Sequence, residues 1–385
     1  MVLRKFTIII ISVFIAVSSL NFAQWESTSG PEAGHITTIS NFNSNIFCGT
    51  QRGDIFSSND NGASWIETGS VQVEVNEQLN TIAGNSTTLF AGTFKNLFRS
   101  TDSGISWSSL LNNIYVNELI SLNENIYAAT GRGVYTTTDN GSTWQNLTAN
   151  LPDTNVTAIE SFGSDLFVAV LGNAVYKSTN NGASWDSAKT GLTSDQINFL
   201  SSDDTNLYAA FSGKAEIFRS TNGGLNWSKA DLIGGNSTFE SVLSLFASPS
   251  GIYAGVIFQG SIFSSISGGI YKSTDEGITW NLHTSGLTNK YIRSLFSDVN
   301  TFIAGTQGGG IFRSSDEGLN WIPSSDGMKR ADVRHIAYAN NGADFFGGVY
   351  GGGFFTSNDS GKTWDPSNIA INFSAFPTVT QFIIK

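Results

Sequence analysis

The stretch that decides the fold is "STDEGITW", from Ser273 to Trp280, in which two acids, hydroxyl side chains and a glycine lead to a terminal tryptophan. Taken alone, such a string is typical of a metal-binding loop. It recurs, however, so that eight similar copies run along the chain and each ends in tryptophan. The copies begin at Ser58, Ser100, Thr137, Ser178, Ser220, Ser273, Ser314 and Ser357.

The steps between successive copies are 37 to 53 residues, which is the length of one four-stranded unit of a radial β architecture. Within each unit, short β-branched and aromatic runs such as Val156 to Ile159 alternate with Gly, Asn and Ser. No helical period is present. The pattern predicts an all-β chain in which each copy of the string is the turn between a third and a fourth strand.

The recurring string, called the box here, has a structural explanation. Asp or Asn in its third position accepts backbone N–H bonds in turns, glycine provides a positive φ, and tryptophan can bury its ring against the next unit. The predicted turn residues are Asp60, Asp102, Asp139, Asn180, Asn222, Asp275, Asp316 and Asp359. The predicted buried rings are Trp65, Trp107, Trp144, Trp185, Trp227, Trp280, Trp321 and Trp364.

These boxes resemble the Asp-box, or bacterial neuraminidase (BNR) repeat, whose pattern is Ser-x-Asp-x-Gly-x-x-Trp. The resemblance implies a β-propeller similar to those of sialidases, xyloglucan-cleaving glycoside hydrolases, sortilin-type receptors and the photosystem II stability factor family. Asn180 and Asn222 depart from the aspartate and Thr137 from the first serine. Asparagine keeps the carbonyl acceptor, so we expect these turns to survive.

Eight repeats predict a single propeller of eight blades over residues 24–370, with a seven-bladed ring and one displaced blade as the alternative. Two segments are candidates for closing the ring. One is the strand containing Trp25, and the other is the tail over residues 371–385, which ends in "TVTQFIIK".

The first residues indicate export. Arg4 and Lys5 precede an apolar run over residues 6–17 and small residues up to Ala23, which is typical of a secretory signal peptide over residues 1–23. A retained N-terminal anchor is the alternative. We expect a periplasmic, cell-surface or secreted protein, and because Cys48 is the single cysteine, its core must hold without an internal disulfide.

The charge balance argues against two classes of partner. The chain holds 31 acidic and 20 basic residues, for a formal net charge of −11. Nucleic-acid affinity comes largely from counterion release at clustered Lys and Arg, and an acidic surface repels phosphate. We therefore expect no binding to nucleic acid or to anionic membranes.

No catalytic set can be identified in the sequence. The resemblance to sialidases implies an arginine triad with a tyrosine nucleophile, but their Arg-Ile-Pro motif is absent, and "WIPSSDG" at Trp321 lacks the arginine. A glycosidase needs two carboxylates about 5–10 Å apart, and no acidic pair outside the boxes stands out. His35, His283 and His335 lie in different repeats without metal-ligand spacing. We predict no metal and no cofactor.

Candidate ligand-binding residues gather on one predicted face, which carries the loops after the second strands and the connections between blades. An insertion over residues 256–269 holds Phe258 and Phe263, although it could also be a plain hairpin. The densest basic stretch, "GMKRADVRH", provides Lys329, Arg330, Arg334 and His335. Arg52, Arg132 and Arg293 are expected on the same face. Solvated charge is the structural alternative for all of these cations.

The sequence thus predicts a secreted, monomeric, non-catalytic propeller that binds a protein or a glycan through its loop face. A glycoside hydrolase, sialidase-like or xyloglucanase-like, with an unrecognised carboxylate site is the alternative.

Overall fold

The computed structural model describes residues 34–74, 77–193, 195–211, 216–230, 240–258, 267–298, 301–326, 328, 333–339, 344–349, 353–358 and 365–366. All regular structure in this part of the chain is β-strand, arranged as eight four-stranded sheets. The signal peptide, Trp25, Asp359, Trp364 and the tail, all interpreted above from the sequence, lie outside the described residues.

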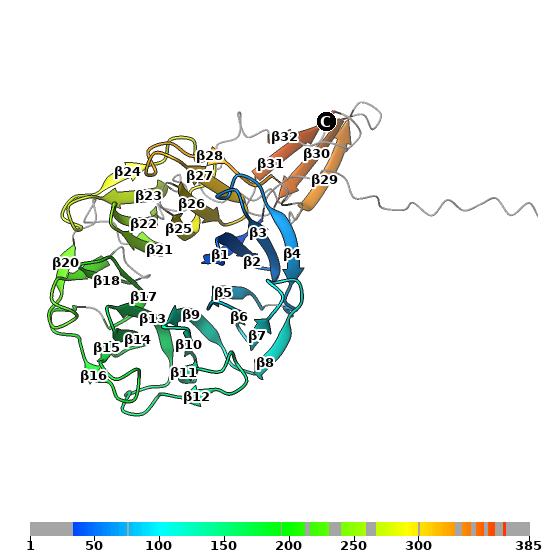
Figure 1. Ribbon diagram of the computed structural model, residues 1–385. Coiled ribbons are helices and arrows are strands. Elements are labelled where there is room, and N and C mark those ends of the chain that lie inside the picture. Colours follow the sequence, from blue (N-terminus) through cyan, green and yellow to red (C-terminus); the bar gives the residue numbers. More distant parts are fainter. Residues whose placement is uncertain are drawn as a thin grey trace, which may run out of the picture.

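Seven of the sheets are the blades of a closed ring, and each blade is made from four consecutive antiparallel strands (Figure 1). The innermost strands are β1 (Ile36–Phe42), β5 (Leu79–Gly84), β9 (Val116–Leu122), β13 (Val156–Phe162), β17 (Ile197–Ser202), β21 (Glu240–Ser248) and β25 (Ile292–Asp298). The second strands are β2 (Asn45–Thr50), β6 (Leu89–Thr93), β10 (Asn125–Thr130), β14 (Asp165–Val170), β18 (Leu207–Phe211), β22 (Gly251–Phe258) and β26 (Thr301–Thr306).

The third strands are β3 (Asp54–Ser58), β7 (Asn96–Ser100), β11 (Gly133–Thr137), β15 (Ala174–Ser178), β19 (Glu216–Ser220), β23 (Ser267–Ser273) and β27 (Ile311–Ser314). The outer strands are β4 (Ile66–Ser70), β8 (Ser108–Asn112), β12 (Gln145–Asn146), β16 (Asp186–Ser187), β20 (Ser228–Ala230), β24 (Asn281–His283) and β28 (Ile322–Pro323). Because each inner strand starts where the preceding outer strand ends, all inner strands begin on one face of the ring. We call this face the rim face.

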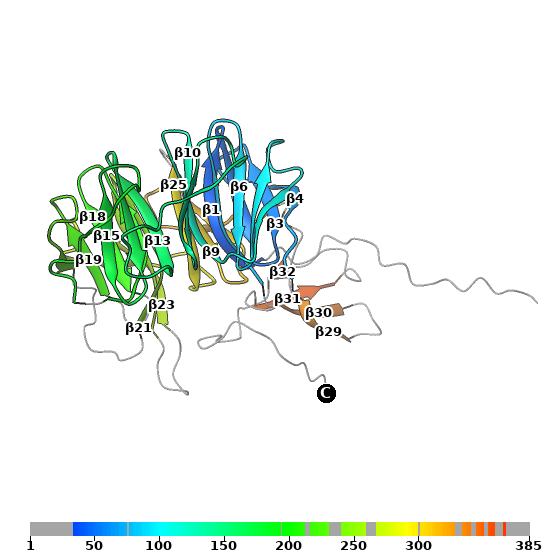
Figure 2. The same cartoon turned by 90° about the horizontal axis from the view of Figure 1, so that it is seen from below.

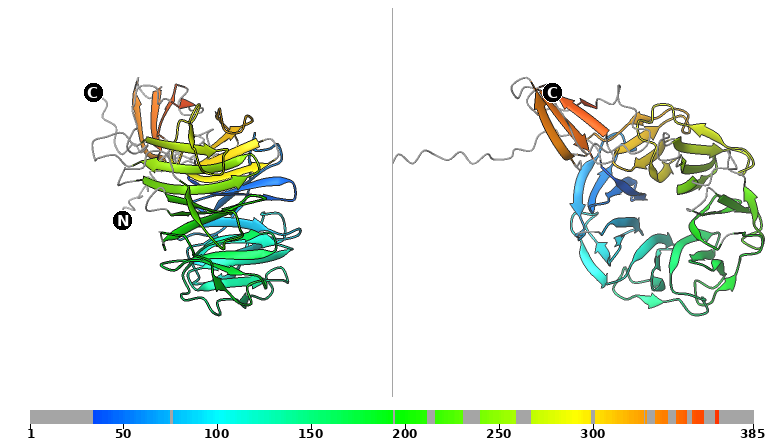
Figure 3. Two further views of the ribbon diagram at one scale, coloured as in Figure 1. Left: turned by 90° about the vertical axis from the view of Figure 1, so that its left-hand side faces the viewer. Right: turned by 180° about the vertical axis from the view of Figure 1, so that it is seen from behind.

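The eighth sheet stands outside the ring. It consists of β29 (Val333–Ala339), β30 (Asp344–Val349), β31 (Gly353–Ser357) and β32 (Asp365–Pro366). Figures 1 and 3 place it beside the blades that open and close the ring, and Figure 2 shows it on the side toward which β21 and β23 extend. The prediction of an eight-bladed ring is therefore wrong, since seven blades close it.

The core of the ring lies between blades. Seven hydrophobic clusters are present among the described residues, and each joins residues of two neighbouring blades. The cluster at the closing seam joins Ile36, Cys48 and Trp65 of the first blade to Ile303 and Ile311 of the seventh. Each blade thus buries both sheet faces, which a lone sheet cannot do.

Hydrogen bonds also link the first and seventh blades. The Trp65 ring, 2% exposed, donates from Nε1 to the Ser324 carbonyl at 2.9 Å, and the Trp65 backbone N–H donates to Asp326 O at 2.9 Å. Ser324 Oγ donates in return to Gly62 O at 2.5 Å. Both blades take all four strands from their own segment of the chain. Among the described residues, packing therefore closes the ring without an exchanged strand.

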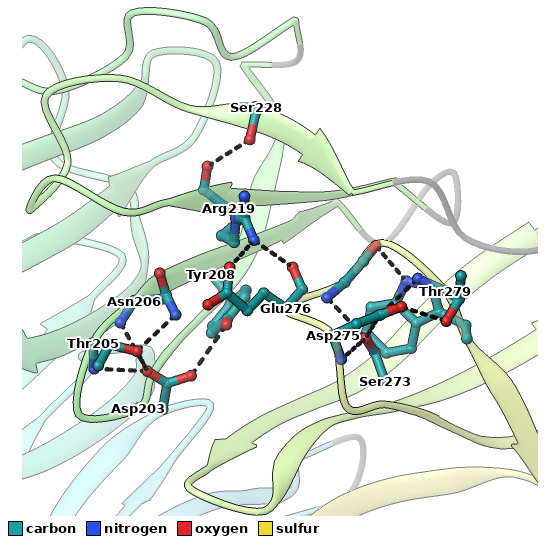
Figure 4. A network of polar contacts seen from close by, with 12 residues as sticks. Asp203, Thr205, Asn206, Tyr208, Arg219, Ser228, Ser273, Asp275, Glu276 and Thr279 are labelled. Carbon is teal, nitrogen blue, oxygen red and sulfur yellow. Dashed lines mark hydrogen bonds and ion pairs between the residues drawn. The ribbon is translucent and has the colours of Figure 1, made fainter.

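The boxes join third and fourth strands and define the opposite face, which we call the box face. In "STDEGITW", Ser273 Oγ donates to Asp275 Oδ1 at 2.8 Å and accepts from Gly277 N–H at 2.8 Å. The Asp275 carboxylate also accepts from Thr279 N–H and from Thr279 Oγ1, at 2.8 and 2.6 Å. Gly277 has a φ of 88°. The box is thus an internally satisfied turn (Figure 4).

A basic side chain just before the box serine reaches into the box turn of the following blade at five of the seven seams. Arg219, for example, pairs with the Glu276 carboxylate and donates to Glu276 O at 3.3 Å (Figure 4). The equivalent bonds are Arg99 to Asn140 O, Lys177 to Gly223 O, Lys272 to Glu317 O and, across the closing seam, Arg313 to Asn61 O. Each of these carbonyls belongs to a residue with positive φ. We call these contacts the clasps.

Candidate functional site

A β-bulge at the start of the inner strands brings polar side chains to the rim face. The register shifts around the second residue of six of the inner strands of the ring, and around the fourth residue of β21. A bulge leaves one residue unpaired and redirects its side chain, and such bulges are common beside binding sites. The seven bulge residues are Thr37, Asn80, Asn117, Thr157, Asn198, Leu243 and Arg293.

Three bulge side chains extend the polar contacts from one blade to the next. Asn80 Nδ2 donates to Val116 O at 2.8 Å, and Asn117 Nδ2 donates to Val156 O at 2.7 Å. Thr157 Oγ1 repeats this bond one blade further, to Ile197 O at 2.7 Å. In this part of the rim, each of these side chains therefore donates a hydrogen bond to a backbone carbonyl of the following blade.

Amide side chains continue this chain of bonds toward the closing seam. Gln51 Nε2 donates to Gln78 Oε1 at 3.4 Å, and Gln78 Nε2 donates to Asn80 Oδ1 at 2.9 Å. Asn80 also hydrogen-bonds the Tyr115 hydroxyl. We call the set His35, Gln51, Gln78, Asn80 and Tyr115 the amide rail. It spans three blades, and none of its side chains is fully buried.

His35 begins the rail at the closing seam. Burial lowers its pKa to about 4, with a further lowering by the charge of Arg293 and an opposing contribution from its hydrogen bond to Gln51. The ring is therefore neutral near pH 7. Its Nδ1 atom is buried and has no hydrogen-bond partner among the described residues. Arg293 Nε donates to Gln307 Oε1 at 3.1 Å, and the backbone of Gln307 bridges to that of His35.

An aromatic pair ends the rail on the side of the third blade. The rings of Phe94 and Tyr115 stack with their centroids 4.4 Å apart and an interplanar angle of 17°. Tyr115 is 41% exposed. The Gly131 N–H donates to Tyr115 O at 2.8 Å, so the loop carrying Arg132 lies beside this pair.

Two acids on neighbouring inner strands are the nearest approach to a catalytic pair. Burial raises the pKa of Glu118 to about 8, and the charge of Glu160 adds to the effect. Burial likewise raises the pKa of Glu160 to about 7. Both carboxylates accept backbone N–H bonds, Glu118 from Ile159 at 2.8 Å and Glu160 from Ser161 at 2.7 Å. Glu118 thus occupies the position that Thr81 has one blade earlier. Thr81 Oγ1 likewise accepts a backbone N–H bond from the inner strand of the following blade, from Leu119.

A groove of about 520 Å³ lies between the sixth and seventh blades, beside the box of the seventh. Its lining comprises Lys272, Thr274, Asn281, His283, Ser315, Asp316, Glu317 and Leu319. Lys272 Nζ pairs with Glu317 Oε2 at 2.8 Å, and His283 Nδ1 donates to Gly318 O at 3.0 Å. The groove therefore follows the seam between two blades, and its Lys272 and Glu317 side chains already pair with each other in a clasp.

The ligand-binding residues predicted from the sequence lie in different parts of the structure. Arg293 lies at the rim beside His35, and Arg52 and Arg132 are exposed on the loops between the second and third strands of their blades. Phe258 ends β22. Arg334 and His335 belong to β29, which lies outside the ring. Phe263, Lys329 and Arg330 lie outside the described residues.

Neither a metal centre nor a membrane-spanning helix is found where the structure is described. Within those ranges, no three His, Cys, Asp or Glu side chains are grouped to hold a metal ion. The same ranges contain no helix with the length and apolar character needed to cross a membrane.

Comparison with known proteins supports the propeller fold. Residues 109–240 match a family model described as the DUF6242 beta propeller domain, and no curated protein matches the chain. The GH74 xyloglucanase from Xanthomonas campestris is similar, with a TM-score of 0.65 and 12% identity over 89% of this chain and 68% of that one.

Two further solved structures have the same fold. The extracellular domain of BT4673 from B. thetaiotaomicron has a TM-score of 0.58 and 16% identity, over 91% of this chain and 48% of that one. YCF48 bound to D1 peptide has a TM-score of 0.57 and 16% identity, over 76% of this chain and 97% of that one. At these identities the likeness concerns the fold alone.

The amide rail was not predicted from the sequence. Gln51 and Gln78 are 27 residues apart, and nothing in their local sequence indicates that they touch. One usable signal was present, because a polar residue follows the first apolar residue of the inner strand in six of the seven ring repeats. That position is the bulge.

Proposed function

We propose that this chain is an exported, non-catalytic β-propeller that binds an extracellular protein or glycan through its rim face. The observation that carries this proposal is the amide rail. The acids and hydroxyls of the box face are used within their own turns. The rim, by contrast, presents half-buried amides, an exposed aromatic ring and several cations. Convergent polar groups on a rigid frame are typical of binding sites.

Three features support export of the chain and ligand binding by its propeller. Residues 1–23 have the pattern of a secretory signal peptide, and one propeller of similar fold is an extracellular domain. YCF48, of similar fold, has been solved bound to D1 peptide, so a ring of this type can hold a ligand.

A pair of crosslinking variants tests where a ligand binds. A photo-reactive amino acid replaces Arg132 on the rim face or Ser142 on the box face, both exposed positions. Offered the same mixture of extracellular proteins and polysaccharides, the variant at position 132 should capture material that the variant at position 142 does not. Equal capture from both positions, or capture from position 142 alone, would contradict the proposal. Ligand recovered after long incubation should be unchanged in size.

Glu118 and Glu160 favour a second candidate, a glycoside hydrolase. Their raised pKa values, about 8 and 7, would suit a general acid, and they occupy adjacent inner strands. A reducing-sugar assay on neutral and acidic polysaccharides tests this candidate. Activity that Glu160→Gln abolishes without a change in melting temperature would favour the hydrolase over the binding protein.

A further inference from the structure

We infer that the amide rail and the Phe94–Tyr115 stack bind an uncharged, hydroxyl-rich polysaccharide lying along the rim from the closing seam to the third blade. This inference rests on the proposed function, because it specifies the chemistry of the ligand held at the same face. It concerns five rail residues and Phe94.

The rail is neutral over its whole length. Gln51, Gln78 and Asn80 carry amides, Tyr115 carries a hydroxyl whose pKa burial raises, and His35 is neutral because its pKa is lowered. A charged ligand gains selectivity and a faster association from opposite charges at the contact surface. A rail without ionic groups selects instead for a ligand without them.

Amide groups match hydroxyl groups in hydrogen-bonding capacity. A side-chain amide has two N–H donors and an oxygen with two lone pairs, and a sugar hydroxyl both donates and accepts. In the rail, Gln78 uses one donor toward Asn80 and one lone pair toward Gln51. A second donor and a second lone pair remain for a ligand.

Tyr115 adds an apolar surface to this set. A stacked aromatic pair holds the Tyr115 ring in place, at 4.4 Å and 17°, while 41% of the residue stays exposed. A pyranose ring has an apolar face of C–H groups, which packs on an aromatic face and is removed from water by that contact. Amides that follow one another from blade to blade suit a ligand whose polar groups also repeat.

The distribution of exposed aliphatic side chains argues against a protein at this site. Protein interfaces have a core that is more apolar than the rest of the surface. Eight large hydrophobic residues are exposed in the described part of the chain, and Tyr115 is the one on the rim. The other seven lie in boxes or outer strands: Ile66, Ile105, Leu225, Ile278, Leu282, Leu319 and Ile322. A protein partner would therefore bind more readily near the box face.

Affinity electrophoresis of the full chain in gels containing glucomannan, xylan or mixed-linkage β-glucan tests the inference. At least one of these neutral polysaccharides should retard the protein. Tyr115→Ala and Gln78→Ala should each weaken the retardation at least tenfold. Tyr115→Phe keeps the ring, so it should stay within about threefold of the unaltered chain.

Leu319→Ser, at a box residue with 57% exposure, is the matched control and should change nothing. Melting temperatures of all variants should agree, so that lost binding is not lost folding. Three results would overturn the inference: no retardation by any neutral polysaccharide, equal retardation of Tyr115→Ala, or retardation by polygalacturonate that Arg293→Ala removes. A different result would be that casein binds, that Gln78→Ala abolishes casein binding, and that no polysaccharide binds. In that case the rim would still be a binding face, but its ligand would be a protein and not a glycan.

Discussion

At the scale of single residues, the boxes show which atoms matter in a repeated turn. Asp275 accepts from Thr279 through both carboxylate oxygens. In one of the two boxes with asparagine, Asn180 Oδ1 accepts from Ser184 N–H at 2.9 Å, and Asn180 Nδ2 donates to Ser184 Oγ at 2.8 Å. The acceptor oxygen is common to both turns, whereas the negative charge is not.

We therefore predict different outcomes for two substitutions of one residue. Asp275→Ala removes the acceptor and leaves Thr279 N–H unpaired, so the melting temperature at pH 7 should fall. Asp275→Asn reproduces the turn of Asn180 and should melt close to the unaltered chain. Differential scanning calorimetry measures both. Equal losses would mean that the charge, and not the acceptor, holds the turn.

The same turns predict a loss of stability in acid. Hydrogen bonds from Thr279 lower the pKa of Asp275 to about 2, and bonds from Ser106 and Thr143 do the same for Asp102 and Asp139. Unfolded aspartate has a pKa of about 3.9. A lowered folded pKa stabilises the fold above about pH 4, and this contribution is lost as the pH falls toward 2. Melting temperatures measured from pH 5 to pH 2 should fall, and less steeply in Asp275→Asn.

At the scale of elements, the clasps hold the third strand to the box turn of the following blade at five of the seven seams. Arg313 closes the ring in this way, with Nε donating to Asn61 O at 2.9 Å. Arg313→Ala leaves that carbonyl to water and should destabilise the fold by about 1 kcal/mol, the usual worth of one such bond. Chemical denaturation measures the loss. Arg132→Ala, on an exposed loop of the rim face, is the control and should fall within the error of the measurement.

At the scale of the whole molecule, seven blades account for the closed ring. Met328 is 2% exposed within the core of the closing seam, and β29 begins five residues later. A chain ending at residue 332 should therefore keep the melting temperature of the ring to within a few degrees. A chain ending at residue 288 loses the seventh blade, exposes two seams and should lose its cooperative transition. Circular dichroism melts of both chains decide this.

The strands and boxes could be predicted from local sequence because each depends on neighbours within one repeat. Ser273, Asp275, Gly277 and Thr279 bond among themselves within seven residues, so the string itself specifies the turn. Trp280 is likewise buried, as its place at the head of an outer strand predicts. The bulge residues were visible as polar positions, but their role depends on the blade that follows.

The number of blades in the ring and the composition of the rail were decided by tertiary structure. Eight repeats are present in the sequence, yet the ring closes after the seventh blade. It closes there because the first and seventh blades pack together, and Trp65 contacts Ser324, 259 residues away in the sequence. The number of blades that closes the ring depends on the angle between neighbouring sheets. Many side-chain contacts between blades set that angle together, so no single repeat specifies it. The rail joins Gln51 to Gln78 and Asn80 to Val116 for the same reason. By itself, the sequence determined the repeating blade and its turn, because those bonds are local; the closed ring and its binding face arise only where separate repeats pack together.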